Sequence, residues 1–304
     1  MNKKSKGILL MILFALSYSI MQIFVNLSSK YGIPVMEQIF VRNLVNMCVV
    51  FCLIRKKGGT LFGDKKYQPW LIARDFVGFL GMMCFFYALA KGNHGDVTIL
   101  NKMSPFFITI FASIFLKEHL SKVQIPALIM AFCGVFFIAN PEFGSYNISL
   151  VVALLSAIAS GVSYTMLSYF KDKVDGLTIV MHFSTFCVFA SLPFMLNDFC
   201  MPTGKCLITL LLVGVFGTLA QVLVTYAYRL APASEISIYN YSGILFSIIM
   251  GYFILNHEVG LNSIIGGGII TAASIMVFTY NRSRSKTQNM DVAKKSTKNI
   301  LKKI

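Results

Sequence analysis

Long apolar runs separated by short polar segments fill the chain from Gly7 to Tyr280. A helix needs about 20 apolar residues to cross a lipid bilayer, so each run of this length predicts one transmembrane helix. Pro34, Pro126 and Pro232 stand near expected helix starts, where a missing backbone N–H is harmless. The pattern predicts an all-α polytopic membrane protein with ten transmembrane helices, near residues 7–29, 34–54, 70–90, 96–116, 123–140, 148–169, 176–195, 207–228, 233–255 and 261–280.

The composition also excludes an ordinary soluble protein. The chain has 304 residues, of which 56% are hydrophobic and 13% charged, and its mean hydropathy is +0.71. Soluble proteins carry about 25% charged residues. A net charge of +15 would favour nucleic-acid binding in a soluble protein, but here the cations lie in loops and at the termini. We therefore expect no nucleic-acid partner. The seven cysteines form no CxxC pair, so we expect no metal or other cofactor.

Lysine and arginine are distributed unevenly between alternate loops. One set holds three lysines at the N-terminus, five cations in the 55–69 segment and a basic C-terminal tail, whereas the other offers little beyond Lys30, Lys91 and Lys205. Because cytoplasmic loops hold the excess of these residues, both termini are expected in the cytoplasm, most simply at a cell (inner) membrane. The tail can contact anionic lipid or remain solvated.

The two halves of the chain share an internal repeat. At an offset of 139 residues, Tyr87-Ala88 matches Tyr226-Ala227 and Asn101 matches Asn240. Five helices per copy is an odd number, so the second copy enters the membrane from the opposite side. We expect two inverted five-helix repeats, 7–143 and 144–281, between a cytoplasmic N-terminus, 1–6, and a basic cytoplasmic tail, 282–304.

A polar stripe in the first span aligns with another in the sixth. At an offset of 142 residues, Tyr18, Gln22 and Asn26 correspond to Ser160, Tyr164 and Ser168. A spacing of four residues places each set on one helical face, and a polar face inside a membrane points to protein or water. We expect a midplane site between these spans.

Motifs in both halves resemble those of the EamA-type transporters of the drug/metabolite transporter (DMT) superfamily, over about residues 7–280. The first half contains Tyr87-Ala-Leu-Ala, Asn101-Lys-Met-Ser-Pro105-Phe-Phe and Leu116-Lys-Glu118-His-Leu120. The second half contains Tyr226-Ala227, Asn240-Tyr241 and Glu258 before Gly266-Gly267-Gly268. Arg42 stands where the family often carries an arginine. The resemblance implies ten helices in two EamA repeats and a carrier of small metabolites, often an exporter or exchanger.

Polar side chains inside the spans are the candidates for substrate binding. Tyrosine offers a ring face and a hydroxyl, amides both donate and accept hydrogen bonds, and a charge deep in a span usually has a partner or a function. Hydrogen bonding between helices is the alternative for each residue alone. The candidates are Tyr18, Gln22, Asn26, Arg42, Tyr87, Asn101, Lys102, Tyr164, Gln221, Tyr226, Asn240 and Tyr241.

Other charged residues have simpler interpretations. Arg42 can form a structural pair with a carboxylate such as Glu37, or with a helix-end carbonyl, instead of binding a substrate. Lys102 can reach the outer membrane interface. Arg74 and Asp75 lie near the cytoplasmic end of the third span, where we expect a surface pair. His182 lies within the seventh span and is interpreted as a hydrogen-bonded structural histidine, with a proton relay as the alternative.

These observations predict a secondary transporter rather than an enzyme, moving a small polar metabolite such as an amino acid by alternating access. The chain lacks ATP-binding and hydrolytic motifs. Acidic residues near the spans are few, which favours a facilitator or exchanger; a proton-coupled drug/metabolite antiporter with Glu37 as titrating group is the alternative. A membrane-embedded lipid-modifying enzyme and a non-transporting assembly partner are more distant alternatives. We expect a monomer or homodimer in contact with membrane lipid.

Overall fold

The computed structural model describes residues 3–91, 97, 100–118, 121–139, 148–202, 204–255, 261–262 and 264–280, and its regular structure there is entirely helical. The helices are α1 Lys3–Lys30, α2 Val35–Lys57, the 3-10 helix η1 Lys65–Tyr67, α3 Gln68–Lys91, α5 Ser104–Phe115, α6 Gln124–Ala139, α7 Ile148–Tyr169, α8 Gly176–Asn197, α9 Lys205–Leu230, α10 Ala233–Ile236, the 3-10 helix η2 Ser237–Tyr241, α11 Ser242–Leu255 and a last helix, Ile264–Tyr280.

Six helices in the described part of the chain are long and apolar enough to cross a membrane: α1, α2, α3, α7, α8 and α9. The apolar helices α5, α6 and Ile264–Tyr280 are shorter. Pro34 and Pro232 immediately precede α2 and α10, and Pro126 lies in the first turn of α6, near the helix starts where the sequence predicts them. The prediction of an all-helical, multi-pass architecture therefore agrees with the structure, while a count of ten full spans remains a prediction.

The expected ninth span is not one continuous α-helix, which corrects the prediction for residues 233–255. Its first turn, α10, passes into the 3-10 helix η2 before α11 begins. The expected fourth span contains a comparable irregularity, because residues 102 and 103 form a turn and α5 begins at Ser104-Pro105. Residues 98–99, and 92–96 before them, lie outside the described residues. Interrupted helices of this kind bring backbone polar groups into the interior of a membrane bundle.

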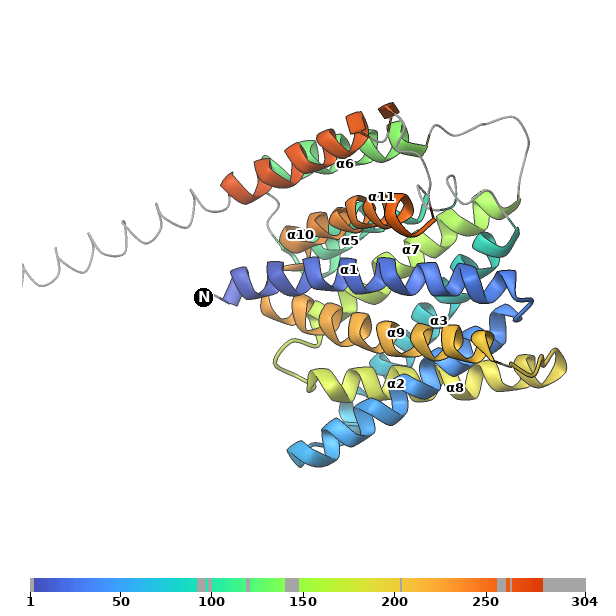
Figure 1. The fold of residues 1–304 in the computed structure, drawn as a ribbon. Helices are drawn as coiled ribbons and strands as arrows, with labels where there is room; N and C mark the ends of the chain where they lie inside the picture. Colours follow the sequence, from blue (N-terminus) through green and yellow to red (C-terminus); the bar gives the residue numbers. More distant parts are fainter. Residues whose placement is uncertain are drawn as a thin grey trace, which may run out of the picture.

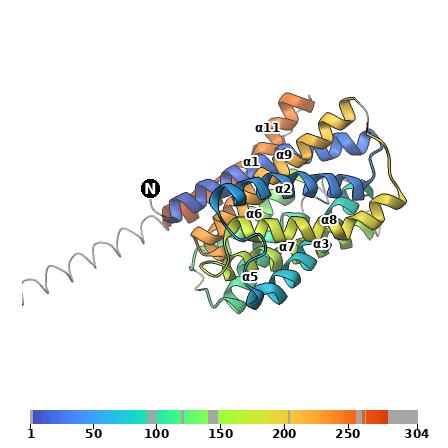
Figure 2. The same ribbon diagram turned by 90° about the horizontal axis from the view of Figure 1, so that it is seen from below.

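The main helix contacts join one half of the chain to the other (Figure 1). Helix α1 packs on α9, and its counterpart α7 packs on α3; α1 also contacts α11, as α7 contacts α5. Helices α2 and α8 pack on each other. In Figure 1, α2 runs from right to left and α8 from left to right, so corresponding helices have opposite directions. Figure 2 shows this pair side by side, with α1 and α9 on one side and α3 and α7 on the other. Corresponding helices of the two halves therefore make corresponding contacts.

Basic residues gather at one end of this bundle. The first turn of α1 holds Lys3 and Lys4, the last turn of α2 holds Arg55, and the last turn of α9 holds Arg229. All three helix ends lie at the left of Figure 1. The N-terminus and the 55–69 segment, which we expect in the cytoplasm, are both at this end, and we refer to it as the basic end.

Glu118, just beyond α5, joins the first half of the chain to the second. Its carboxylate accepts hydrogen bonds from the backbone N–H groups of Ala233 (3.1 Å) and Ser234 (2.9 Å), and from the Ser234 hydroxyl (2.7 Å). Gln124 donates its side-chain amide to the Ser234 carbonyl at 2.9 Å. The glutamate of the Leu116-Lys-Glu118 motif thus satisfies the free donors at the start of the second half's interrupted helix.

Candidate functional site

A cavity of about 60 Å³ is lined by residues of α1, α2, α3, α7, α8 and α9. One part of its wall is apolar or aromatic and the other part polar, as expected of a site that orients a small ligand. The rings and thioethers come from Tyr18, Met21, Met82, Phe85, Phe86, Tyr164 and Phe183, and the polar groups from Arg42, Arg74, Asn101, Ser160, Ser163 and Gln221.

Arg42 places a buried positive charge in this wall. Its side chain is in the interior, with the residue 5% exposed. Its Nη1 lies 3.1 Å from the Met82 sulfur and 3.5 Å from Asn43 Oδ1, and no described carboxylate forms an ion pair with it. The expected alternative of a pair with Glu37 is wrong, because Glu37 instead accepts a hydrogen bond from the backbone N–H of Cys200 at 3.0 Å. Arg42 thus keeps its charge available to the cavity.

Arg74 and Asp75 are buried, which corrects the prediction of a surface pair. They are 1% and 0% exposed, and Arg74 Nη1 lies 3.1 Å from Asp75 Oδ1. The guanidinium also stacks over the Phe183 ring at 4.3 Å. Helix α3 packs between α7 and α8, so a residue only two turns from its start is already covered by neighbouring helices. The sequence places Arg74 and Asp75 near a helix end, but it does not show which neighbouring helices bury them.

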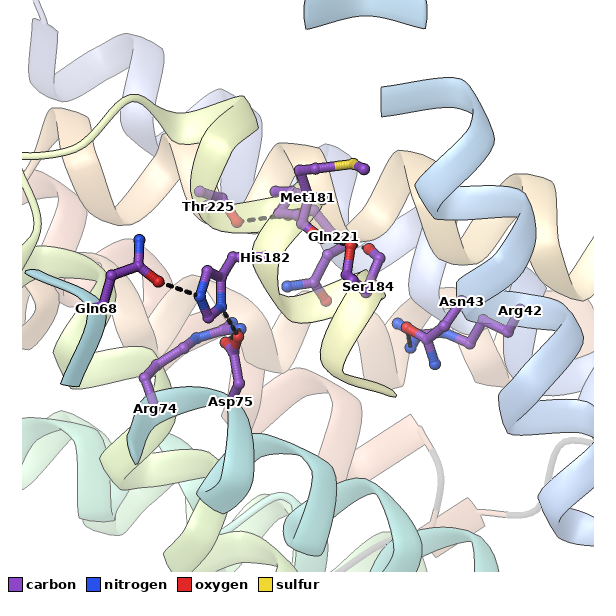
Figure 3. Close-up of polar contacts among 12 residues, drawn as sticks. Arg42, Asn43, Gln68, Arg74, Asp75, Met181, His182, Ser184, Gln221 and Thr225 are labelled. Carbon is purple, nitrogen blue, oxygen red and sulfur yellow. Dashed lines mark hydrogen bonds and ion pairs between the residues drawn. The ribbon is translucent and has the colours of Figure 1, made fainter. Parts of the chain in front are cut away.

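His182 continues the network from α8 (Figure 3). Its Nδ1 lies 2.5 Å from Asp75 Oδ2, and its Nε2 lies 2.9 Å from Oε1 of Gln68. The histidine therefore contacts a polar partner through each ring nitrogen, as the structural interpretation of this residue expects. A proton relay remains compatible with the same contacts.

Three residues that line the cavity each hold a buried hydrogen-bond donor without an acceptor in the described structure: Nε of Arg42, Nε of Arg74 and Nε2 of Gln221. They come from α2, α3 and α9. A buried donor left unsatisfied costs about 1–3 kcal/mol, and more when it is charged. All three groups donate, so the arrangement is complementary to a ligand rich in acceptor oxygens.

Several sequence-predicted residues meet at this cavity. Tyr18, Arg42, Asn101, Tyr164 and Gln221 all line it. Asn101 also donates to the Ser156 hydroxyl at 3.0 Å, so a hydrogen bond between helices accounts for part of its role. The first and sixth spans therefore face each other here through Tyr18 and Tyr164, as the aligned stripes suggested.

Other candidates lie away from the cavity. Tyr87 is 45% exposed, and Tyr226 packs against Gly176 at the start of α8. Lys102 is buried near Gly243 rather than extended to an interface. The remaining four do not line the cavity either, with Gln22 and Asn26 further along α1 and Asn240 and Tyr241 buried in η2.

Gly217 on α9 provides the space that the Arg42 side chain occupies. A Cβ atom at this position would lie 2.8 Å from Arg42 Nε and 3.0 Å from its Cγ. We expect Gly217→Ala to displace the guanidinium and weaken ligand binding by about tenfold, the effect of losing one hydrogen bond to a charged group. Gly268→Ala is the matched control, because its Cβ would meet no atom within 4 Å. Equal affinity in both variants, measured by calorimetry, would contradict this role.

Comparison with known proteins gives one family and several relatives. The sequence pattern of the EamA-like transporter family matches residues 5–140 and 147–279. The pseudopaline exporter CntI of Pseudomonas aeruginosa is 30% identical over 271 residues, covering 88% of this chain and 94% of the exporter. An S-adenosylmethionine uptake transporter of Rickettsia bellii is 24% identical over 224 residues, covering 73% of this chain and 77% of that protein.

A solved crystal structure has the same fold. It superposes with a TM-score of 0.78 and 13% sequence identity, covering 92% of this chain and 99% of that chain. At this level of identity the likeness concerns the arrangement of helices alone.

Proposed function

Since the chain belongs to the EamA-like transporter family, whose named relatives are transporters rather than enzymes, we propose that it carries a small polar metabolite bearing a carboxylate or phosphate group across the membrane. The chain is an integral, multi-pass membrane protein. The proposal concerns the substrate class and the route through the bundle.

The unsatisfied donors of Arg42, Arg74 and Gln221 carry this proposal. Arginine guanidinium groups bind carboxylates and phosphates through paired hydrogen bonds, and these bonds strengthen where water is excluded. Asp75 balances only one of the two guanidinium charges. A bound anion would balance the other and accept the free N–H groups, while the surrounding rings would pack on its apolar part.

The small volume of the cavity supports alternating access. Ligand pockets for small molecules measure about 300–1,000 Å³, far more than the 60 Å³ of this cavity. On this proposal the helices must therefore separate before a metabolite enters. Inverted repeats provide two related ways of opening, one toward each side of the membrane.

A ligand screen on the purified protein tests the substrate class. We expect small mono- and dicarboxylates or phosphate esters to raise the unfolding temperature, while amide or methyl ester analogues of the same compounds do not. A ligand at 100 times its Kd stabilises the folded state by about 2.7 kcal/mol, which is well within reach of a thermal-shift measurement.

Uptake of the stabilising anion into proteoliposomes tests whether the protein transports the ligand that it binds. An anion that stabilises the protein should enter with saturable kinetics, and its neutral analogue should not compete. Equal stabilisation by neutral analogues would contradict the anionic substrate class. Lipid turnover without solute flux would favour the membrane-enzyme alternative.

A further inference from the structure

A second cavity, separate from the central one, is an apolar groove lined by α8, α3 and the segment that precedes α3. Its volume is about 510 Å³, and its lining residues include Phe62, Ile72, Thr185, Phe186, Phe189 and Ala190. We infer that this groove binds one acyl chain of an anionic phospholipid, whose headgroup lies against Lys65 and Lys66 at the basic end. The inference concerns a lipid site and does not depend on the substrate proposed above.

The groove follows the axis of α8. Its residues on this helix recur at spacings of three and four, which places them on one helical face. From His182 to Ala190 the helix rises about 12 Å. Helix α8 is long and apolar enough to cross the membrane, and it begins at the basic end (Figure 1). A groove along it therefore has the direction in which the acyl chains of a bilayer extend.

The wall of the groove offers hydrocarbon rather than free hydrogen-bonding groups. Thr185 donates its hydroxyl to the Met181 carbonyl at 2.9 Å within the same helix. His182 contacts a polar partner through each ring nitrogen. Ile72 and Phe189 are 48% and 68% exposed, although both belong to helices that can span the membrane. Such a surface packs favourably against an acyl chain.

A basic loop lies at one end of the groove. Oε1 of Gln68 lies 2.9 Å from His182 Nε2, and the Phe62 ring meets the His182 ring edge-on with 6.1 Å between the centroids. Figure 3 shows Gln68 beside His182. Both ends of the short loop between Phe62 and Gln68 thus contact α8 at the groove. Lys65 and Lys66 belong to this loop, so their charges lie near the end of the groove.

The cations of this segment have no carboxylate partner in the described structure. None of them takes part in an ion pair, and Asp64 is the sole acidic residue in the sequence from 55 to 68. Each lysine or arginine near a membrane surface strengthens binding to anionic lipid about fivefold. A phospholipid phosphate complements this charge. The exposed cations are Arg55, Lys56, Lys57, Lys65 and Lys66.

The same charge disfavours a second copy of this chain in the groove. Two copies in one membrane have the same orientation, so a dimer through this face would place two basic segments side by side. Like charges repel each other there, whereas an anionic headgroup neutralises them. Charge complementarity therefore selects the lipid as occupant.

A bound acyl chain would also cover the edge of the buried polar network. His182 is 9% exposed, and its partner Asp75 pairs with Arg74, which lines the central cavity. Because the groove is lined by both α3 and α8, a chain within it contacts both helices. The lipid would thus stabilise the packing that holds this network together.

Fluorescence quenching by brominated lipids tests the site on the full-length protein in vesicles. Trp70 is the single tryptophan of the chain, and its ring lies 5.9 Å from that of Tyr169, outside the groove. Ile72→Trp in a Trp70→Phe background moves the single tryptophan into the groove, two residues along the same helix. We expect this groove reporter to prefer phosphatidylglycerol over phosphatidylcholine about tenfold, and Trp70 to prefer it no more than about twofold.

Charge variants test the headgroup contact. Lys65→Gln combined with Lys66→Gln should lower the preference at the groove reporter to about twofold. Lys3→Gln combined with Lys6→Gln is the matched control, because it removes the same exposed charge from the basic end of α1. This control should retain the tenfold preference. Equal losses in the two double variants would indicate a general surface potential and overturn the site.

A groove variant tests the acyl chain. Thr185→Phe places a ring in the middle of the groove and should lower the preference at the groove reporter to about twofold, because chain and headgroup bind as one molecule. The preference measured at Trp70 should not change. A tenfold preference that persists in this variant would overturn the groove as the binding site.

The two reporters also separate the remaining occupants. Equal preferences at both positions, or no preference at the groove reporter, would overturn the inference. A groove reporter that no brominated lipid quenches, in a protein that cross-links as a dimer, would show a second copy in the groove and likewise reject the lipid. None of these measurements uses a transported solute, so failure of the anion screen would leave them unaffected.

Discussion

Replacing Arg42 by methionine should lower uptake of an anionic substrate into proteoliposomes by about 100-fold, equivalent to about 2.7 kcal/mol of binding free energy. Truncating one member of a buried charged pair generally costs about 2–5 kcal/mol, and here the bound anion would be the other member. Methionine matches the unbranched stem and fills the space beside Gly217 and Met82. Radiolabelled uptake and calorimetric affinity measure the effect.

The ligand-free protein should remain at least as stable after this substitution. A buried guanidinium without a carboxylate partner costs desolvation energy, and an apolar side chain of similar volume removes that cost. Arg55→Met provides the matched control on the same helix, because Arg55 is exposed and stacks over the Phe51 ring at 5.2 Å. Wild-type affinity in Arg42→Met would refute a direct role in binding, and comparable losses in both variants would indicate a general charge effect.

Replacing Glu118 by alanine should lower the free energy of unfolding by about 3 kcal/mol. The substitution removes three hydrogen bonds, two from backbone N–H groups and one from the Ser234 hydroxyl. These donors begin the interrupted helix of the second half, and neither Ala233 nor Ser234 is exposed enough for water to replace the carboxylate, at 0% and 2%. Reversible unfolding in mixed micelles measures the loss.

Two variants separate this effect from the loss of any charge at the same place. Ser234→Ala removes one of the three bonds and should cost about 1 kcal/mol. Glu235→Ala removes a partly exposed ion pair with Lys4 and should cost less than about 1 kcal/mol. If Glu118→Ala behaves like Glu235→Ala, the contact between the halves contributes little to stability.

The apolar pattern of the sequence was sufficient to predict a helical, multi-pass membrane protein, since a bilayer imposes one length and one polarity on every spanning helix. The offset matches between the halves pointed to inverted repeats, and the fold has reciprocal contacts of α1 with α9 and of α7 with α3. Tyr18 and Tyr164 were also found by spacing, because a polar stripe in a membrane helix has to face the interior.

Only the tertiary structure shows the burial and the partners of Arg74, Asp75 and Glu37. Distance from a helix end suggested an exposed pair at 74 and 75, yet α7 and α8 cover that turn of α3 and bury both side chains. Gln68 and His182 are separated by 114 residues and meet only because α8 packs beside α3. Hydropathy describes one helix at a time, whereas burial and charge pairing depend on which helices become neighbours; the sequence determined the membrane fold, and the packing determined which polar groups work together.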